Sequence, residues 1–234
     1  MKCDIAGSIG NRYLGAVLPV TSLDNLETAE ITSILIPGAA EEETEHLRER
    51  YLQHTRIKPF AGNRSSYVEL ISGMPGVGAV KVTPFWRGAG TVLITLTDSS
   101  YGIASDAFVR QIQEVVCPIG DTSGLGLAPI GHNVTIQSVK AKEITVQLSV
   151  AIASGYTTSL ISAEIEETIN LYLMELRKAW AKESATIVRT AQITSRVMAI
   201  RGVVDVYSVQ MNQSSRNMTL DSNTIPILGG VVLV

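Results

Sequence analysis

One alternating run followed by one helical run constrains the fold of this chain more than any other feature. Apolar residues occupy every second position from 144 to 152, with polar or small residues between them: Ile144, Val146, Leu148, Val150 and Ile152. This period of two predicts a strand with one buried and one solvated face. Apolar residues then recur at helical spacing, at Ile161, Ile165, Ile169, Tyr172, Leu176 and Trp180. They predict a helix of about five turns that lies across a sheet.

Further strand and helix patterns continue to the C-terminus. The segments "TIVRT" at 186–190 and "VVDVYSV" at 203–209 predict strands, and "ITSRVMAIRG" at 193–202 predicts a helix between them. Residues 126–234 are therefore predicted to form a domain of order ββαβαβ, followed by a terminal segment. In such a domain the helices cover one face of a mostly antiparallel sheet.

An earlier domain is predicted at 37–125. The stretch 37–59 predicts a helix, because its acidic residues gather near the start and its basic residues near the end. Asn63 is the expected N-cap of a second helix. Two strands follow, "AVKVTPF" and "GTVLITL", and a third helix begins at Ser105. The predicted order is ααββα.

The predicted fold class is α+β, with two small α/β-layer domains whose sheets are mixed and mostly antiparallel. A short β-rich segment at 1–36 precedes them, and we expect it to be the end of a truncated unit. The Gly- and Pro-rich stretch 118–133 is predicted to link the two domains. Gly76 and Gly202 each lie between a helix and a strand, where a left-handed glycine turns the chain. Whether this similarity reflects an internal duplication stays open.

Composition argues against several function classes. The formal net charge is −3 and the basic residues form no stripe, which disfavours binding to nucleic acid. No window approaches 18 uninterrupted apolar residues, so we expect no membrane span. The only cysteines are Cys3 and Cys117, too few for a disulfide framework or a cysteine zinc site. They indicate synthesis in a reducing compartment, the cytoplasm.

Nucleotide and metal motifs are also missing. The stretch "GLGLAPIG" from Gly124 has Pro129 where a dinucleotide fingerprint requires its third glycine. His46 and His54 are eight residues apart on one predicted helix, so their side chains do not converge on a metal. We therefore expect no cofactor and no metal ligands.

The stretch "GDTSG" at 120–124 offers the best candidates for catalysis, and they are weak. It matches neither an aspartic protease motif nor a serine nucleophile with a supporting base. We expect no catalytic residues and no enzyme activity. The alternative is a small α+β hydrolase or ligand-binding enzyme in which Asp121, Ser123 and His132 meet in a pocket.

The segment "PFWRG" at 84–88 is the best candidate for a contact with another protein. Phe85, Trp86 and Arg87 follow a predicted strand and lie beside glycines. Aromatic residues and arginine are enriched among the residues that dominate binding energy at protein interfaces. The alternative is that Phe85 or Trp86 fills the core of the first domain.

Several short motifs, in this order and spacing, resemble the phage baseplate J-like family. They run along most of the chain: "GN" at 10–11, "LRERYL" at 47–52, "KPFAGN" at 58–63, Tyr67, "PGVGAVKVTP" at 75–84, "GTV" at 90–92, "CPIGDTSGLGLAPIG" at 117–131 and "IVR" at 187–189. Members of the family generally carry a substantial region before the "GN" element, whereas here Met1 lies just upstream of it.

The resemblance implies a wedge protein in the baseplate of a contractile phage tail or tail-like particle. Such a protein is expected in the virion tail baseplate, after synthesis in the host bacterial cytoplasm. Its implied partners are copies of itself and other wedge and hub proteins, and it would relay a change of shape to the sheath. The family pattern includes no cofactor and no catalytic residues.

Overall fold

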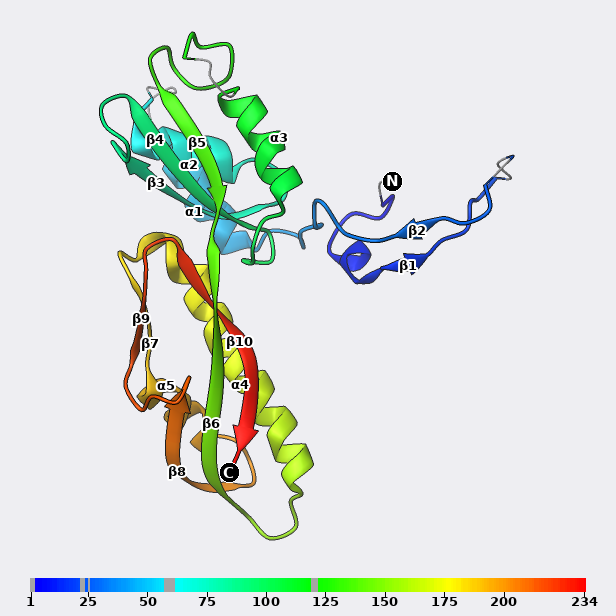
Figure 1. Cartoon of the computed structure of the whole chain (residues 1–234), viewed down its shortest axis with the longest axis vertical. Helices are drawn as coiled ribbons and strands as arrows, with labels where there is room; N and C mark the ends of the chain where they lie inside the picture. Colours follow the sequence, from blue (N-terminus) through cyan, green and yellow to red (C-terminus); the bar gives the residue numbers. More distant parts are fainter. Residues whose placement is uncertain (1–2, 22–23, 25, 57–61, 119–121) are drawn as a thin grey trace. The chain divides into compact units, whose positions relative to one another are not determined.

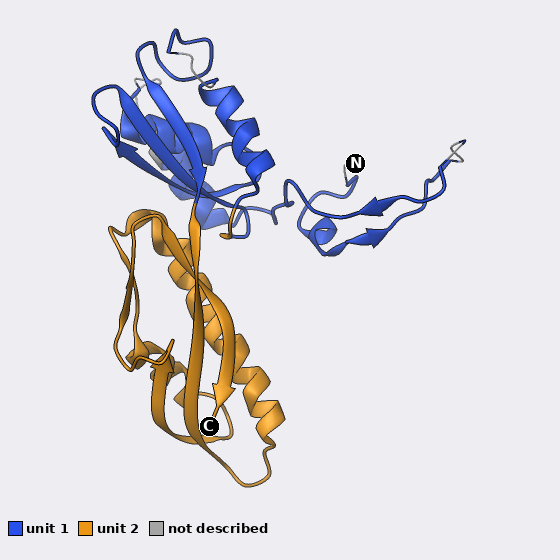
Figure 2. Cartoon of the chain, viewed as in Figure 1, with its two compact units in different colours: residues 1–100, 104–138 blue, residues 101–103, 139–234 orange. Residues whose placement is uncertain are grey.

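The computed structural model describes residues 3–21, 24, 26–56, 62–118 and 122–234. The chain forms two compact units (Figure 2): unit 1 contains residues 1–100 and 104–138, and unit 2 contains 101–103 and 139–234. The division at 138/139 lies later than the boundary predicted at 125/126. The reason is that the strand β5 (Asn133–Ser138) pairs with a strand of unit 1 and not with unit 2.

Unit 1 is built on one three-stranded mixed sheet with two helices packed on it (Figure 1). The sheet order is β3-β4-β5, with an antiparallel pair β3–β4 and a parallel pair β4–β5. In chain order its elements are η1 (Ile9–Arg12), β1 (Gly15–Ala16), β2 (Glu30–Ile31), α1 (Thr44–Arg56), α2 (Arg64–Ser72), β3 (Val77–Pro84), β4 (Thr91–Asp98), α3 (Asp106–Val116) and β5 (Asn133–Ser138). The stretch after α3 that was predicted to link two domains is therefore a loop within unit 1.

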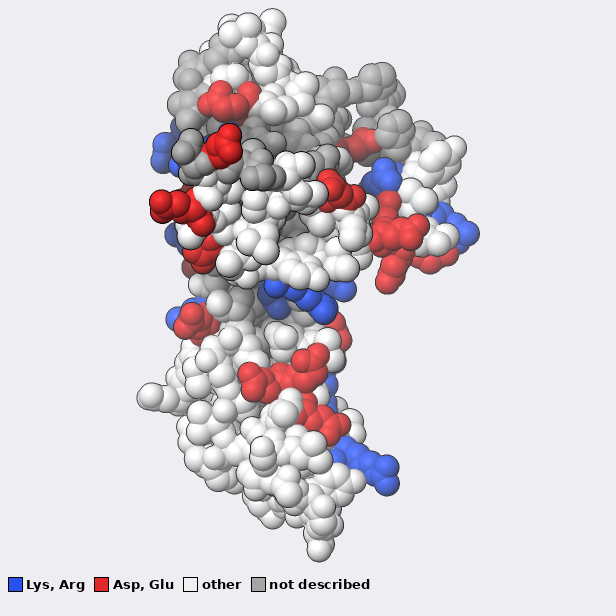
Figure 3. All heavy atoms as spheres, turned by 90° about the vertical axis from the view of Figure 1, so that its right-hand side faces the viewer, with Lys and Arg blue, Asp and Glu red and all other residues white. Residues whose placement is uncertain are grey.

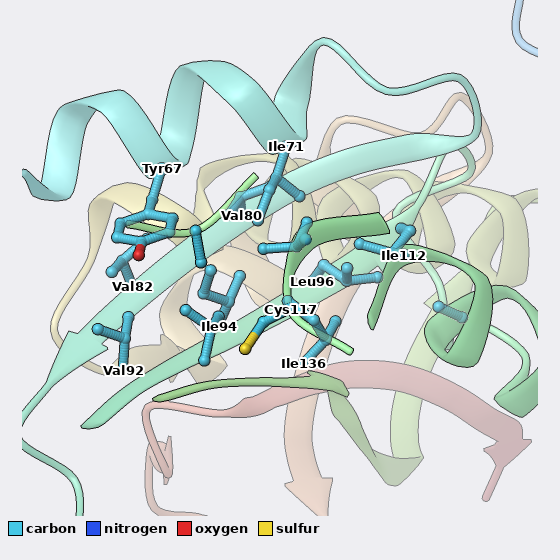
Figure 4. Packing of buried hydrophobic residues seen from close by; sticks show 14 of the residues in the cluster. Tyr67, Ile71, Val80, Val82, Val92, Ile94, Leu96, Ile112, Cys117 and Ile136 are labelled. Atoms are coloured by element: carbon cyan, nitrogen blue, oxygen red, sulfur yellow. The ribbon is translucent and has the colours of Figure 1, made fainter. Parts of the chain in front are cut away.

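The core of unit 1 lies between the sheet and the helices α2 and α3. Alternate strand residues face the helices, as the period of two requires. Figure 4 shows this packing, in which Tyr67 and Ile71 of α2 point at the sheet. The buried strand residues of this cluster are Val80, Val82, Val92, Ile94, Leu96, Val134 and Ile136.

Side-chain caps fix the starts of α2 and α3. Asn63 Oδ1 accepts a hydrogen bond from the Ser66 N–H at 2.9 Å, as the sequence predicted. Ser105 Oγ accepts one from the Phe108 N–H at 3.2 Å. Each cap satisfies one of the backbone donors that a helix start leaves without an intrahelical partner.

Unit 2 also has a three-stranded mixed sheet, of order β10-β6-β8, and a smaller sheet β7-β9. The pair β10–β6 is parallel and the pair β6–β8 is antiparallel. In chain order its elements are β6 (Lys140–Ile152), α4 (Thr158–Ala179), η2 (Trp180–Lys182), β7 (Thr186–Val188), α5 (Thr190–Met198), β8 (Val203–Met211), β9 (Met218–Leu220) and β10 (Thr224–Leu233). The terminal segment therefore supplies an edge strand of the main sheet, which the predicted order did not include.

The alternating run and the helical run form the core of unit 2, as predicted. Ile144, Val146 and Leu148 of β6 are fully buried, and so are Ile161 and Ile165 of α4. The helix is 22 residues long, about six turns. The predicted α+β fold class is confirmed, with one parallel and one antiparallel pairing in each three-stranded sheet.

The N-terminal part of the chain contrasts with both cores. None of the residues described between 3 and 52 is buried. The short pair β1–β2 is antiparallel, and Asn11 anchors the base of this segment by hydrogen bonds of 2.7 Å to both the N–H and the carbonyl of Gly38. Within the described part of the chain, no helix has the length and apolar character needed to cross a membrane.

Candidate protein interface

Backbone hydrogen bonds hold the turn between β3 and β4 in a defined shape. The Phe85 N–H donates to the Thr91 carbonyl at 2.8 Å, and the Gly88 N–H donates to the Phe85 carbonyl at 3.2 Å. The Thr91 hydroxyl accepts from the Arg87 N–H at 3.0 Å and donates to the Gly88 carbonyl at 2.7 Å. The three side chains of the "FWR" segment therefore project from an ordered turn.

Phe85 lies outside the core of unit 1. Its side chain is 71% exposed, and its backbone has a φ of 58°, in the left-handed region that non-glycine residues rarely occupy. The alternative in which Phe85 fills the core is therefore excluded. The exposed Phe85 ring therefore stays a candidate for contact with another protein.

Trp86 and Arg87 form a pair beside Phe85. The Arg87 guanidinium carbon lies 4.2 Å from the centroid of the Trp86 ring, within the range of a cation–π interaction. Trp86 is half-buried, whereas Arg87 is exposed. The stacking restricts the side chains of both residues.

The loop between α3 and β5 lies beside this turn, at the same end of unit 1 (Figure 1). The Asn133 N–H donates to the Gly90 carbonyl at 2.8 Å and so joins the two segments. Leu125 and Ile130 of the loop are 83% and 81% exposed. We call Phe85, Trp86, Arg87, Leu125 and Ile130 together the two-loop surface. The sequence did not predict Leu125 and Ile130 as interface residues, because the Gly- and Pro-rich stretch that carries them is typical of a linker.

His132, one of the alternative catalytic residues, is half-buried and packs against Tyr67 in unit 1. Its ring stacks on Tyr67 with 5.9 Å between centroids and 28° between planes, and the Tyr67 hydroxyl lies 2.7 Å from His132 Nδ1. Burial, with a smaller contribution from nearby Cys117, raises the pKa of Tyr67 to about 12. The hydroxyl therefore keeps its proton at neutral pH, and its hydrogen bond with Nδ1 orients the His132 ring.

The other residues of the alternative site are not assembled with His132 into a pocket by the described part of the chain. Ser123 is exposed, and Asp121 lies outside the described residues. An open groove of about 380 Å³ lies elsewhere, in unit 2, where Glu166, Glu167 and Asn170 of α4 face the Gly229–Gly230 segment of β10. Neither Ser123 nor His132 lines it.

Metal-binding geometry is also not found in the described part of the chain. His46 Nδ1 lies 2.7 Å from a carboxylate oxygen of Glu42, and Arg50 forms a salt bridge with the same carboxylate. The side chain of His54 lies outside the described residues. Among the positions that the structure describes, no group of three or more His, Cys, Asp or Glu residues is placed to hold a metal ion.

Charged side chains form no binding stripe on the face shown in Figure 3. Acidic and basic residues are interspersed there among wide uncharged areas. This distribution agrees with the net charge of −3 and with the absence of a basic run in the sequence. The face shown therefore presents no continuous basic or acidic surface.

Two compact units, each with a three-stranded mixed sheet, define the class of two-domain α+β chains. Comparison with known families gives the particular family. The model of the baseplate J-like central domain matches residues 59–138, and the model of the baseplate J-like protein C-terminal domain matches residues 144–234. The chain belongs to the baseplate J-like family, which confirms the resemblance in its motifs.

Two of the relatives are named as proteins of a phage-like element and of a phage. The chain is 32% identical over 234 residues to the phage-like element PBSX protein XkdT of Bacillus subtilis, covering 99% of this chain and 66% of the relative. It is 25% identical over 228 residues to the baseplate protein gp47 of Escherichia phage Mu, covering 94% of this chain and 60% of gp47. The chain thus spans 66% and 60% of the lengths of these two relatives.

A solved assembly contains the same fold. A chain in the cryo-EM structure of the anti-feeding prophage baseplate superposes with a TM-score of 0.53 at 12% sequence identity. The match covers 91% of this chain and 46% of that chain. At this identity the similarity establishes the fold alone.

Proposed function

We propose that this chain is a structural component of the baseplate of a phage or prophage contractile tail. In this role it acts as a wedge protein, which assembles with copies of itself and with other wedge and hub proteins. Family membership and a Mu relative named as a baseplate protein support this function. The structural observation that carries it is the two-loop surface, which presents anchor-type side chains on an ordered turn.

We further propose that the protein has no catalytic activity of its own. His132 supports this view, because its ring is hydrogen-bonded to Tyr67 and stacked on it, and so stabilises the end of the loop that precedes β5. In a wedge, the compact units transmit force as rigid parts and the contacts between proteins change. The relay of a conformational change to the sheath then depends on interfaces such as the two-loop surface, in which packed side chains can be exchanged between alternative partners.

A binding experiment with paired substitutions tests this function. The Phe85→Ala/Trp86→Ala variant should lose at least tenfold in affinity for the products of neighbouring tail genes, because it removes two aromatic anchors. A tenfold loss corresponds to about 1.4 kcal/mol. Affinity is measured by pull-down and by light scattering of the mixed proteins, and circular dichroism checks that the variant is folded.

Tyr207→Ala is the matched control, because Tyr207 is also an exposed aromatic residue, 68% exposed, but lies on β8 of unit 2. It should bind like the unmodified chain. Equal affinity for all three proteins would show that the two-loop surface is not the interface. Failure of the unmodified chain to bind any baseplate protein would overturn the proposed function itself.

A further inference from the structure

The strand β10 has a free edge. It lies at one end of the sheet order β10-β6-β8, so within the described chain it has β6 on one side and no strand on the other. Figure 1 shows β10 at the outer side of this sheet, with α4 packed against it. Apart from the ladder with β6, residues 225–233 make no hydrogen bond within the described part of the chain. Their outward N–H and carbonyl groups are therefore available to a further strand.

An open groove of about 380 Å³ lies beside this edge, between α4 and residues 228–230 of β10. Glu166 and Asn170 of its lining each follow a buried isoleucine of α4 by one residue. They therefore lie roughly 100° around the helix from the side that packs on the sheet. Ala163 and the two glycines of the lining carry too few side-chain atoms to fill the space. The groove thus has room for a side chain of another protein.

The glycines also expose the backbone of β10. The register between β10 and β6 shifts between Leu228 and Gly230, which leaves Gly229 as the extra residue of a β-bulge. Gly229 is exposed, and a Cβ on Gly230 would meet nothing within 4 Å. Glycines inside a strand often mark a place where another backbone approaches closely. Pro226 has no N–H to donate, so a further strand is expected to pair with residues 227–233.

The groove is acidic. Glu166 and Glu167 line it, and none of its lining residues is basic. Neither carboxylate forms a salt bridge within the described part of the chain. Residues 158–176 of α4 contain four glutamates and no basic residue. A lysine or arginine side chain is therefore complementary to the groove, whereas an acidic side chain would be repelled.

We propose that an extended segment of another protein adds to the free edge of β10 and places a lysine or arginine side chain against Glu166 and Glu167. Main-chain hydrogen bonds along β10 supply affinity, and the charged pair selects the segment. The apolar stem of the basic side chain lies along Leu228 and the glycines, and its charged head reaches the carboxylates. The inference rests on the proposed function for the source of its partner. It gives unit 2 an interface of its own, in addition to the two-loop surface of unit 1.

Charge reversal tests the groove. The chain is mixed separately with each product of a neighbouring tail gene, and the affinity of each pair is measured. Glu166→Lys should lower the affinity for at least one of these proteins by about tenfold or more, because it opposes the basic side chain of the partner. The difference should narrow as the salt concentration rises, because screening weakens the attraction and the repulsion. Circular dichroism checks that the variant is folded.

Glu164→Lys is the matched control. Glu164 is exposed on the same helix, two residues before Glu166 and so roughly 160° around it, and does not line the groove. The two variants change the net charge equally at nearly the same distance from the start of α4. Glu164→Lys should bind like the unmodified chain. Equal losses in the two variants would show a general effect of charge and overturn the groove as the binding site.

Hydrogen exchange measures the strand addition itself. In the complex with the protein that depends on Glu166, outward amides within residues 227–233 should exchange about tenfold more slowly or less than in the free chain, because they gain hydrogen-bond acceptors. The strand β8, at the opposite edge of the same sheet, is the internal control and should not change. Unchanged exchange in residues 227–233 would overturn strand addition.

The groove and the proposed function can fail separately. If the chain captures tail proteins through Phe85 and Trp86 and Glu166→Lys has no effect on any of them, the function stands and the groove proposal is wrong. If the unmodified chain captures no tail protein, the proposed function is wrong and the groove proposal is wrong with it.

Discussion

At the scale of single residues, one aromatic side chain of unit 1 is buried and another is exposed to solvent. Tyr67 is 1% exposed and combines apolar packing with a hydrogen bond to His132, whereas Phe85 is 71% exposed. The difference arises from position, because Tyr67 lies on the inner face of α2 and Phe85 lies on a turn beyond the end of β3. The two residues therefore predict different consequences when they are changed, one for stability and one for binding.

Removal of the Tyr67 hydroxyl should destabilise unit 1. Tyr67→Phe removes the hydrogen bond between the hydroxyl and His132 Nδ1 and should lower the free energy of unfolding by about 1 kcal/mol. Chemical denaturation measures the change. The control is Tyr207→Phe on the exposed surface of β8, which should change stability by less than about 0.5 kcal/mol. Equal losses in the two variants would contradict a structural role for the Tyr67–His132 bond.

The same residue predicts a dependence of stability on alkaline pH. Burial raises the pKa of Tyr67 from 10.0 to about 12. Below pH 10 the hydroxyl is protonated in both states and its contribution is complete. Between pH 10 and 12 the unfolded chain loses the proton and the folded chain retains it, so the free energy of unfolding falls as pH rises. The fall should be shallower in Tyr67→Phe.

At the scale of elements, a helix, a left-handed glycine and a strand recur in both units. Gly76 has a φ of 89° before β3, and Gly202 has a φ of 101° before β8. Each of these strands is an edge strand antiparallel to the central strand of its sheet, and the other neighbour of that central strand is parallel. Each glycine thus allows the chain to turn from a helix into the edge strand that follows it.

Substitution of Gly202 should be more damaging than substitution of Gly155. Both glycines have a positive φ, which costs about 1–2 kcal/mol for alanine. A Cβ on Gly202 would also lie 2.5 Å from a Tyr156 ring carbon, whereas a Cβ on Gly155 would meet nothing within 4 Å. We expect Gly202→Ala to lose at least about 1 kcal/mol more than Gly155→Ala in thermal or chemical denaturation. Similar losses would show that the ring moves away freely.

At the scale of the whole molecule, the chain has two separate hydrophobic cores. Ile94 belongs to the cluster of unit 1 and Ile165 to that of unit 2, and both are 0% exposed. Neither cluster contains a residue described between 3 and 52. The described residues of the N-terminal part therefore contribute to neither core.

The two cores predict localised effects of core substitutions. Ile94→Ala should destabilise unit 1 by about 2–5 kcal/mol, and Ile165→Ala should do the same to unit 2. Hydrogen exchange should accelerate mainly in the sheet β3-β4-β5 for the first variant and in β10-β6-β8 for the second. Val204→Ala, at a side chain that is 60% exposed, is the control. Equal acceleration throughout the chain in both variants would contradict two cores.

The sequence by itself determined the local elements and much of the core. The alternating run of β6, the apolar face of α4 and the cap at Asn63 all rest on interactions between residues close in the chain, which a local pattern records. The candidate residues Phe85, Trp86 and Arg87 also came from a local motif. Their role as an interface stays a prediction.

Only the tertiary structure decided which distant strands pair. The parallel partners β4–β5 and β6–β10 are joined by long connections, and no local pattern specifies the register between them. For this reason β5 was assigned to the wrong unit and β10 was missed. Leu125 and Ile130 join the two-loop surface because a tertiary hydrogen bond, from the Asn133 N–H to the Gly90 carbonyl, brings their loop beside the turn between β3 and β4. Pairing between distant segments depends on the summed free energy of the whole sheet, and that quantity is not encoded in any single stretch of the chain.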